Sequence, residues 1–192
     1  MHKAASRSIV NGEIDNNDRA DLSTWIMEQG YDRYTILEIM KYRTLAMWIS
    51  CMCQVWEQQI SLFLKKEFET ERLELVGNKG QPIVDFNIEQ LWEIFRQFQV
   101  EVKSLQCWSK INEMRQLVNV IKHGEGRSAS TLKTIRPDFF NTGNEFMLTD
   151  GMTKYGVTLL DTTLTITNQD FIDYFNAVIQ FWTDLPERMY EK

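Results

Sequence analysis

Proline, glycine, cysteine and histidine are all scarce in this sequence. Its 192 residues include three prolines, nine glycines, three cysteines and two histidines. The sequence contains no internal repeat and no low-complexity run. The three cysteines form an odd set within apolar segments, so we expect buried free thiols in a reducing compartment and no disulfide framework. Histidine chemistry must use His123, because His2 belongs to a polar N-terminal arm.

Long apolar runs are also missing. No window approaches the roughly 18 consecutive apolar residues that a membrane span requires. The first seven residues carry charge, but an asparagine- and aspartate-rich stretch follows them instead of an apolar secretory core. We therefore expect a cytoplasmic protein that does not enter a membrane.

Positive charge is not in excess. The 21 lysines and arginines are outnumbered by 27 aspartates and glutamates, which gives a net charge of −6. The chain as a whole therefore offers no electrostatic attraction for nucleic acid. A local basic surface stays open, because Lys122, His123, Arg127, Lys133 and Arg136 lie close together in the sequence.

The composition that is present is typical of a globular protein. Hydrophobic residues make up 43% of the chain and aromatic residues 12%, which is enough to build a core. Trp48, Trp56, Trp92 and Trp182 fall on apolar stripes, which favours core or interface positions over base stacking. We expect a flexible arm over residues 1–20 and a single helical domain over residues 21–192.

Apolar residues recur at helical spacing in four segments. The predicted helices cover residues 32–68, 87–105 and 109–123, and a last one that starts at Thr167 or Asn168 and ends before Pro186. Residues 155–160 and 163–167 alternate between apolar and polar types, which predicts a β-hairpin at about 155–167. The expected fold is mainly α: an antiparallel bundle of four main helices, with a small hairpin inserted before the last one.

Turn residues predict how these elements are connected. Residues 21–24 could cap a short helix ahead of the first long one. Gly124 is expected to stop the third helix, and the Gly124-Glu125-Gly126-Arg127 segment is interpreted as a cap and turn. It is not a phosphate-binding P-loop, because it follows a helix and lacks the Gly-Lys-Ser/Thr ending. Residues 125–144 are expected to form a loop.

A polar stripe on the third predicted helix could carry chemistry. Arg115, Asn119 and His123 advance by about 40° each, so they share one face, which points away from the apolar side. An imidazole can accept or position the proton of a ribose 2′-hydroxyl, while a guanidinium stabilises charge on a phosphate. The spacing alone favours a simpler interpretation, in which Lys122-His123-Gly124 is a favourable helix end and the other polar residues are solvated.

The segment from Arg115 to Asp138 resembles HEPN proteins. The similarity lies in Arg115, Asn119-x-x-x-His123 and the continuation Lys122-His123-Gly124 and Arg136-Pro137-Asp138. HEPN proteins carry an arginine followed a few residues later by a histidine on a helix of a helical bundle. They typically dimerise with their motifs facing each other, and many are ribonucleases of toxin or phage-defence systems.

This resemblance implies a homodimeric, metal-independent endoribonuclease that needs no cofactor. Arg115, Asn119 and His123 would be its catalytic residues, and Lys122, Arg127 and Arg136 would contact the RNA substrate. Seven residues separate Arg115 from His123, which places their backbones about 12 Å apart. The site would then need the other protomer's arginine, or Arg127, or the protein is an inactive relative. The alternative is a non-catalytic HEPN-like interaction or dimerisation subunit, bound to an antitoxin or a defence ATPase.

Overall fold

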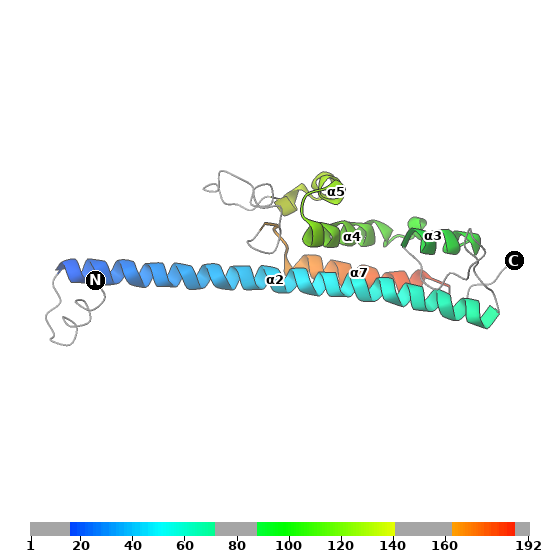
Figure 1. Cartoon of the computed structure of the whole chain (residues 1–192), viewed down its shortest axis with the longest axis horizontal. Coiled ribbons are helices and arrows are strands. Elements are labelled where there is room, and N and C mark those ends of the chain that lie inside the picture. The colour runs from blue at the N-terminus through cyan, green and yellow to red at the C-terminus, as the bar shows by residue number, and fades with distance from the viewer. Residues whose placement is uncertain (1–15, 72–87, 141–162, 187–192) are drawn as a thin grey trace. The chain divides into compact units, whose positions relative to one another are not determined.

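The structure is a computed structural model that describes residues 16–71, 88–140 and 163–186. Contacts between Cα atoms divide the chain into two compact units, Met1–Lys41 and Tyr42–Lys192. Helix α2, Asn16–Glu71, contributes residues to both (Figure 1).

The described part of the first unit is helical from residue 16. The predictions that a separate short helix precedes the first long helix and that the long helix begins near residue 32 are therefore wrong, and residues 16–20 of the predicted arm are helical. Ser23 and Thr24 donate to the carbonyl of Ala20 within α2, at 2.8 and 3.0 Å, and do not cap a new helix. Large apolar side chains of this stretch, including Met27 and Leu37, are exposed.

The second unit contains the main core. Besides α2 from Tyr42 onward, it comprises α3 (Ile88–Gln97), η1 (Val102–Ser104), α4 (Trp108–His123), α5 (Arg127–Ile135), η2 (Pro137–Phe140) and α7 (Asn168–Asp184). The described residues are therefore mainly helical, as predicted. Helix α4 begins one residue earlier than the predicted 109–123 and ends at the same residue.

Two predicted segments differ from the structure. The helix expected over 87–105 ends at Gln97, because Gln99 adopts a left-handed conformation, with φ 62°, that interrupts the helix. The loop expected over 125–144 is also wrong in its first part. Residues 127–135 form α5, a helix that is stabilised because its own Ala129 and Leu132 are fully buried. Gly124, with φ 68°, ends α4 as predicted.

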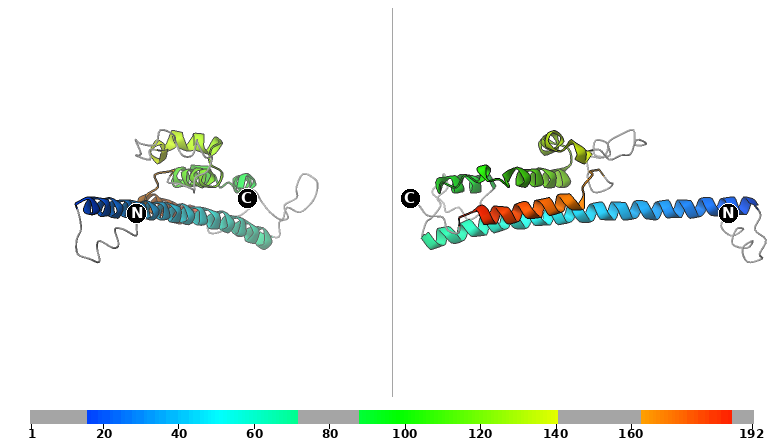
Figure 2. Two further views of the ribbon diagram at one scale, coloured as in Figure 1. Left: turned by 60° about the vertical axis from the view of Figure 1, so that its left-hand side comes forward. Right: turned by 180° about the vertical axis from the view of Figure 1, so that it is seen from behind.

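Three helices of the second unit lie side by side. Trp56 of α2 contacts Phe181 of α7 edge to face at 5.2 Å, and Tyr174 of α7 bonds to Glu113 of α4. Helix α4 runs opposite to both α2 and α7, which run in the same direction as each other (Figures 1 and 2). Because α5 and η2 intervene along the chain, α7 need not run opposite to α2.

The centre of this arrangement is strongly aromatic. Trp56, Phe95, Tyr174 and Phe181 are among its fully buried side chains. Aliphatic side chains complete the layer between the helices; those that are fully buried include Ile49, Ile60, Leu64, Ile111, Met114, Leu117 and Leu132. The predicted core positions at Trp56 and Trp92 are confirmed, whereas Trp48 is exposed.

The predicted hairpin falls mostly outside the described residues. Residues 155–162 cannot be compared, and residues 163–167 do not form a strand in the part of the chain that is described. The Thr165 N–H donates to the carbonyl of Phe139 in η2, at 2.7 Å, and Leu164 and Ile166 are buried against the helices. This extended segment leads directly into α7. None of the described helices is long and apolar enough to cross a membrane.

Helix α7 is capped at the predicted position, Thr167, and its first turn is a complete capping box. The Thr167 hydroxyl oxygen accepts from the Asp170 N–H at 3.2 Å, and the Asp170 carboxylate accepts from the Thr167 N–H at 2.8 Å. The helix ends before Leu185 and Pro186. Both predicted boundaries of this helix are confirmed.

Replacing the capping residue should destabilise the protein measurably. We expect Thr167→Ala to lower the free energy of unfolding by about 1 kcal/mol, because the Asp170 N–H in the first turn of α7 loses its acceptor. Thr183→Ala is the matched control, since the Thr183 hydroxyl only donates to the Ile179 carbonyl within the same helix. Its effect should stay within about 0.5 kcal/mol. Urea unfolding followed by circular dichroism measures both; equal losses would contradict the capping role.

Candidate functional site

Arg115, the first predicted catalytic residue, is held against neighbouring helices. Its Nε donates to the Glu57 carboxylate of α2 at 3.2 Å, and its guanidinium lies 5.9 Å from the centre of the Trp92 ring of α3. Only 14% of the Arg115 side chain is exposed. The sequence predicted that this residue faces away from the core, which is wrong because α2 and α3 cover that side of α4.

Three more of the predicted residues follow Arg115 toward the C-terminal end of α4, and Arg127 begins α5. Asn119 is half-buried, whereas Lys122 and His123 are exposed in the last turn, and Arg127 is exposed at the start of α5. Eight positions along α4 separate His123 from Arg115, or about 12 Å along the helix axis. The structure thus brings Lys122, His123 and Arg127 to one corner and leaves Arg115 with α2.

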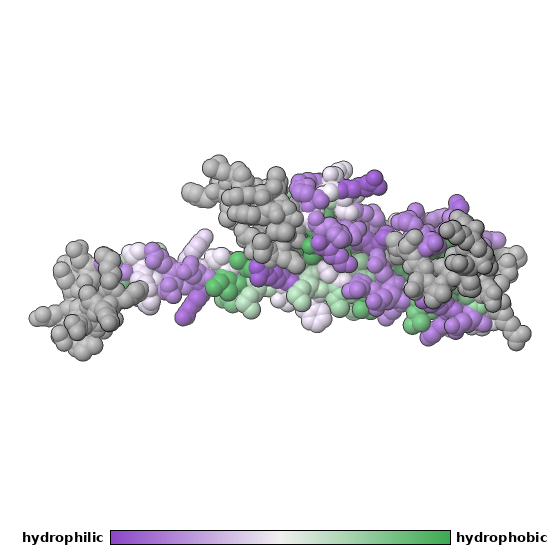
Figure 3. All heavy atoms as spheres, in the orientation of Figure 1, coloured by the Kyte–Doolittle hydropathy of each residue, from purple (hydrophilic) through white to green (hydrophobic). Residues whose placement is uncertain are grey.

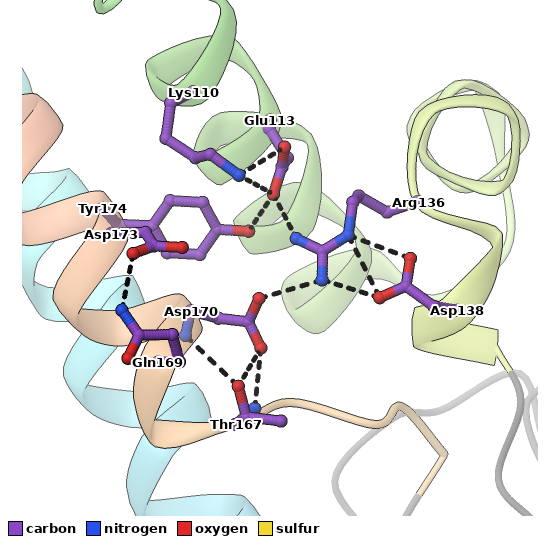
Figure 4. Close-up of polar contacts among 9 residues, drawn as sticks. All are labelled: Lys110, Glu113, Arg136, Asp138, Thr167, Gln169, Asp170, Asp173 and Tyr174. Carbon is purple, nitrogen blue, oxygen red and sulfur yellow. Dashed lines mark hydrogen bonds and ion pairs between the residues drawn. The ribbon is translucent and has the colours of Figure 1, made fainter.

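Arg136, a predicted substrate contact, lies instead at the centre of a polar cluster. Its Nη1 donates to Glu113 of α4 at 2.6 Å, and its Nη2 donates to Asp170 of α7 at 2.9 Å. Nε and Nη2 also bind the Asp138 carboxylate at 2.9 and 2.7 Å. The guanidinium stacks 3.8 Å from the centre of the Phe139 ring. We call these four charged residues the Arg136 centre (Figure 4).

Two further side chains saturate Glu113. Lys110 donates to both carboxylate oxygens at 3.0 Å, and the Tyr174 hydroxyl donates to Oε1 at 2.9 Å. Burial raises the pKa of Tyr174 above its ordinary value, and the neighbouring Glu113 carboxylate raises it further. Tyr174 therefore stays protonated and acts as a donor, so it is not a candidate general base.

The electrostatics of the Arg136 centre favour a structural role. The hydrogen bond to Asp138 is the largest effect that raises the pKa of Arg136, and bonds to Asp170 and Glu113 add to it. In return, Arg136 holds the pKa of Asp138 below its ordinary value. A guanidinium that faces three carboxylates has its charge compensated, which makes it a poor partner for an RNA phosphate.

Sequence reasoning did not anticipate Glu113, Asp170 and Tyr174 as partners of Arg136. Asp170 carried a local signal, because Thr167-x-x-Asp170 fits a capping box. The same carboxylate caps α7 through Oδ2 and binds Arg136 through Oδ1. Glu113 carried no signal, since its partners lie 23 and 61 positions away along the chain.

The three cysteines are free, as the sequence predicts. Cys53 and Cys107 are buried, and burial raises the pKa of both, for Cys53 to about 12. Cys51 is exposed, which corrects the expectation that all three thiols are buried. Two residues turn a helix by about 200°, so Cys51 and Cys53 occupy nearly opposite sides of α2. In the part of the chain that the structure describes, no group of side chains is arranged to hold a metal ion.

A shallow pocket of about 350 Å³ lies between α4 and α7. Lys110 and Asp173 supply its charged side chains, and Cys107 and Gln180 are among its other lining residues. Because Lys110 already donates to Glu113, its charge is largely committed to the Arg136 centre. We assign no ligand to this pocket.

Comparison with known protein families, curated proteins and solved structures finds no match for this chain. The resemblance to HEPN proteins therefore rests on the residues of the α4 and α5 segment alone.

Removing the arginine of the Arg136 centre should destabilise the fold strongly. We expect Arg136→Met to lower the free energy of unfolding by about 3 kcal/mol, because it leaves the buried Asp170 without its cation and leaves Glu113 with Lys110 alone. Arg127→Met is the control: the same substitution at an exposed arginine, with an expected effect within about 0.5 kcal/mol. Urea unfolding of both variants decides the question, and equal stability of the two would show that the Arg136 centre is not a structural anchor.

Proposed function

We propose that this chain is a non-catalytic helical interaction subunit, which binds another protein chain through the outer face of α2 in the second unit. The resemblance to HEPN proteins suggests a bacterial toxin–antitoxin or phage-defence complex in the cytoplasm as its setting. The observation that carries the proposal is the composition and exposure of that face.

The outer face of α2 consists of Met47, Trp48, Cys51, Val55 and Leu62. Trp48 is 61% exposed and Met47 is 67% exposed, although such large apolar side chains are normally withdrawn from water. Figure 3 shows hydrophobic side chains exposed along α2. Extended apolar surfaces of this kind commonly mark protein–protein interfaces, and tryptophan is enriched among the residues that dominate binding energy.

Charge is almost absent from the same stretch of α2. Between residues 44 and 64, Glu57 is the single charged residue, and it is paired with Arg115. The solvent side of a surface helix normally carries charged residues opposite its apolar stripe. Here the solvent side carries apolar residues, glutamines and serine through about six turns. This composition is typical of a face that another chain covers.

The position of Arg115 supports a non-catalytic role. A phosphate would have to displace Glu57 from Arg115, and would meet a guanidinium that α2 and α3 partly cover. The two residues that define the HEPN motif therefore do not converge within one chain.

One observation favours ribonuclease activity as a second candidate. Lys122, His123 and Arg127 are exposed together at the corner between α4 and α5. Two cations beside an imidazole form a locally basic surface on a chain of net charge −6. If His123 accepted a proton from a ribose hydroxyl there, Lys122 and Arg127 would contact the phosphate and Arg115 would not be needed.

A bacterial expression experiment separates the two candidates. RNA integrity and growth are measured for the wild type, His123→Ala and Val55→Lys, after circular dichroism has shown that each variant folds. We expect intact RNA in all three cultures, and any growth defect should depend on Val55 and not on His123. RNA cleavage by the wild type that disappears in folded His123→Ala would contradict the proposal and establish the ribonuclease.

A further inference from the structure

We infer that the outer face of α2 pairs with the same face of a second copy of this chain, which forms a two-fold symmetric homodimer. This inference rests on the proposed function, because it names the partner that covers the face. Three features of this face support a second copy: the spacing of its apolar residues, the absence of charge and the neighbouring face of α7.

The apolar residues on the outer face follow a heptad spacing. Trp48, Val55 and Leu62 are seven residues apart, and Cys51 lies between the first two at the intermediate position of a heptad. This stripe is rotated by about 130° from the buried stripe that includes Ile49 and Trp56. Helix α2 therefore carries two separate packing stripes, and its own fold covers only one of them.

The lack of charge favours a copy of the same chain as the partner. In a two-fold interface the same patch occurs on both sides, so any central charge approaches its own equivalent and is repelled. Each chain already has a net charge of −6, which opposes association unless the contact surface is neutral. A different protein would commonly be selected by complementary charges, and this face offers none.

Helix α7 extends the same side of the unit. Its exposed Ile172, Phe175 and Ile179 lie about 130° around the helix from Tyr174, which contacts α4. On α2, the outer face is likewise turned about 160° from Glu57, which contacts α4. Both apolar stripes therefore point away from α4 on two neighbouring parallel helices.

Two copies can bury these exposed stripes against each other. A pair of helices on each copy presents a broad apolar side, and stacking two such pairs buries both in a four-helix contact. A contact of two helices against two offers far more area than a single helix stripe, as a specific interface requires.

Light scattering coupled to size exclusion tests the inference on the full chain. We expect the wild type to have twice the 22.7 kDa chain mass. Val55→Lys should weaken dimerisation at least a hundredfold and give the monomer mass, because two lysines would approach each other in the contact. Ile135→Lys is the matched control: Ile135 of α5 is 44% exposed against 45% for Val55, and this variant should remain a dimer.

Cys51 provides an independent probe. Among the three free cysteines it is the exposed one, so a bismaleimide reagent should join two wild-type chains and should not join Cys51→Ser chains. A wild type that is monomeric, or a dimer that Val55→Lys leaves intact, would overturn the inference. If either result is obtained and RNA stays intact in the expression experiment, the proposed interaction subunit binds a different protein instead of a second copy. RNA cleavage that depends on His123 would instead contradict the proposed function, whatever the oligomeric state.

Discussion

The ion pairs of Arg136 with Glu113 and Asp170 are the interaction on which the second unit depends. They join three segments that are far apart in the sequence, α4, the α5 to η2 connection and α7, at one buried point. Burying these charges is unfavourable unless they form ion pairs. A placement of α7 that separated Asp170 from Arg136 would leave the buried Asp170 carboxylate without a cation. Since Asp170 also caps α7, the same contact determines where the helix begins and how it lies against α4.

The position of α7 then determines which surface stays exposed. With Tyr174 directed at α4 and Phe181 at Trp56, the other side of α7 presents Ile172 and Ile179 outward. The rotation of α2 is set in the same way by the Glu57–Arg115 ion pair and by the contact of Trp56 with Phe181. As a result, the heptad stripe of α2 faces outward. The apolar side proposed as the dimer contact is thus a consequence of the polar cluster on the other side of these helices.

Local patterns in the sequence predicted the elements well where one helix and its caps contain the whole signal. The boundaries of α4, the stop at Gly124 and the cap at Thr167 all belong to this class. Helix α5 was missed because its serines and threonines resemble a loop, and its stability comes from burying Ala129 and Leu132. The Arg136 centre could not be predicted, since its partners are joined by tertiary contacts. Apolar periodicity also could not tell that Trp56 is core while Trp48 is exposed.

The same limit applies to the candidate site. Helical spacing placed Arg115, Asn119 and His123 on one stripe, but it could not show that α2 covers one end and leaves the other in water. Whether His123 has a chemical role remains a prediction from the HEPN resemblance. The apolar side of α2 and α7, by contrast, is visible only in the structure.

The central claim is that an uncharged face joins two copies of the chain, and the salt dependence of self-association tests it most directly. Sedimentation equilibrium would compare the wild type between about 0.1 M and about 1 M salt, where the Debye length falls from about 10 Å to about 3 Å. Our account predicts a dimer that persists or tightens as salt rises, because salt screens only the repulsion between two acidic chains. A dimer that dissociates with rising salt, or a monomer throughout, would contradict it.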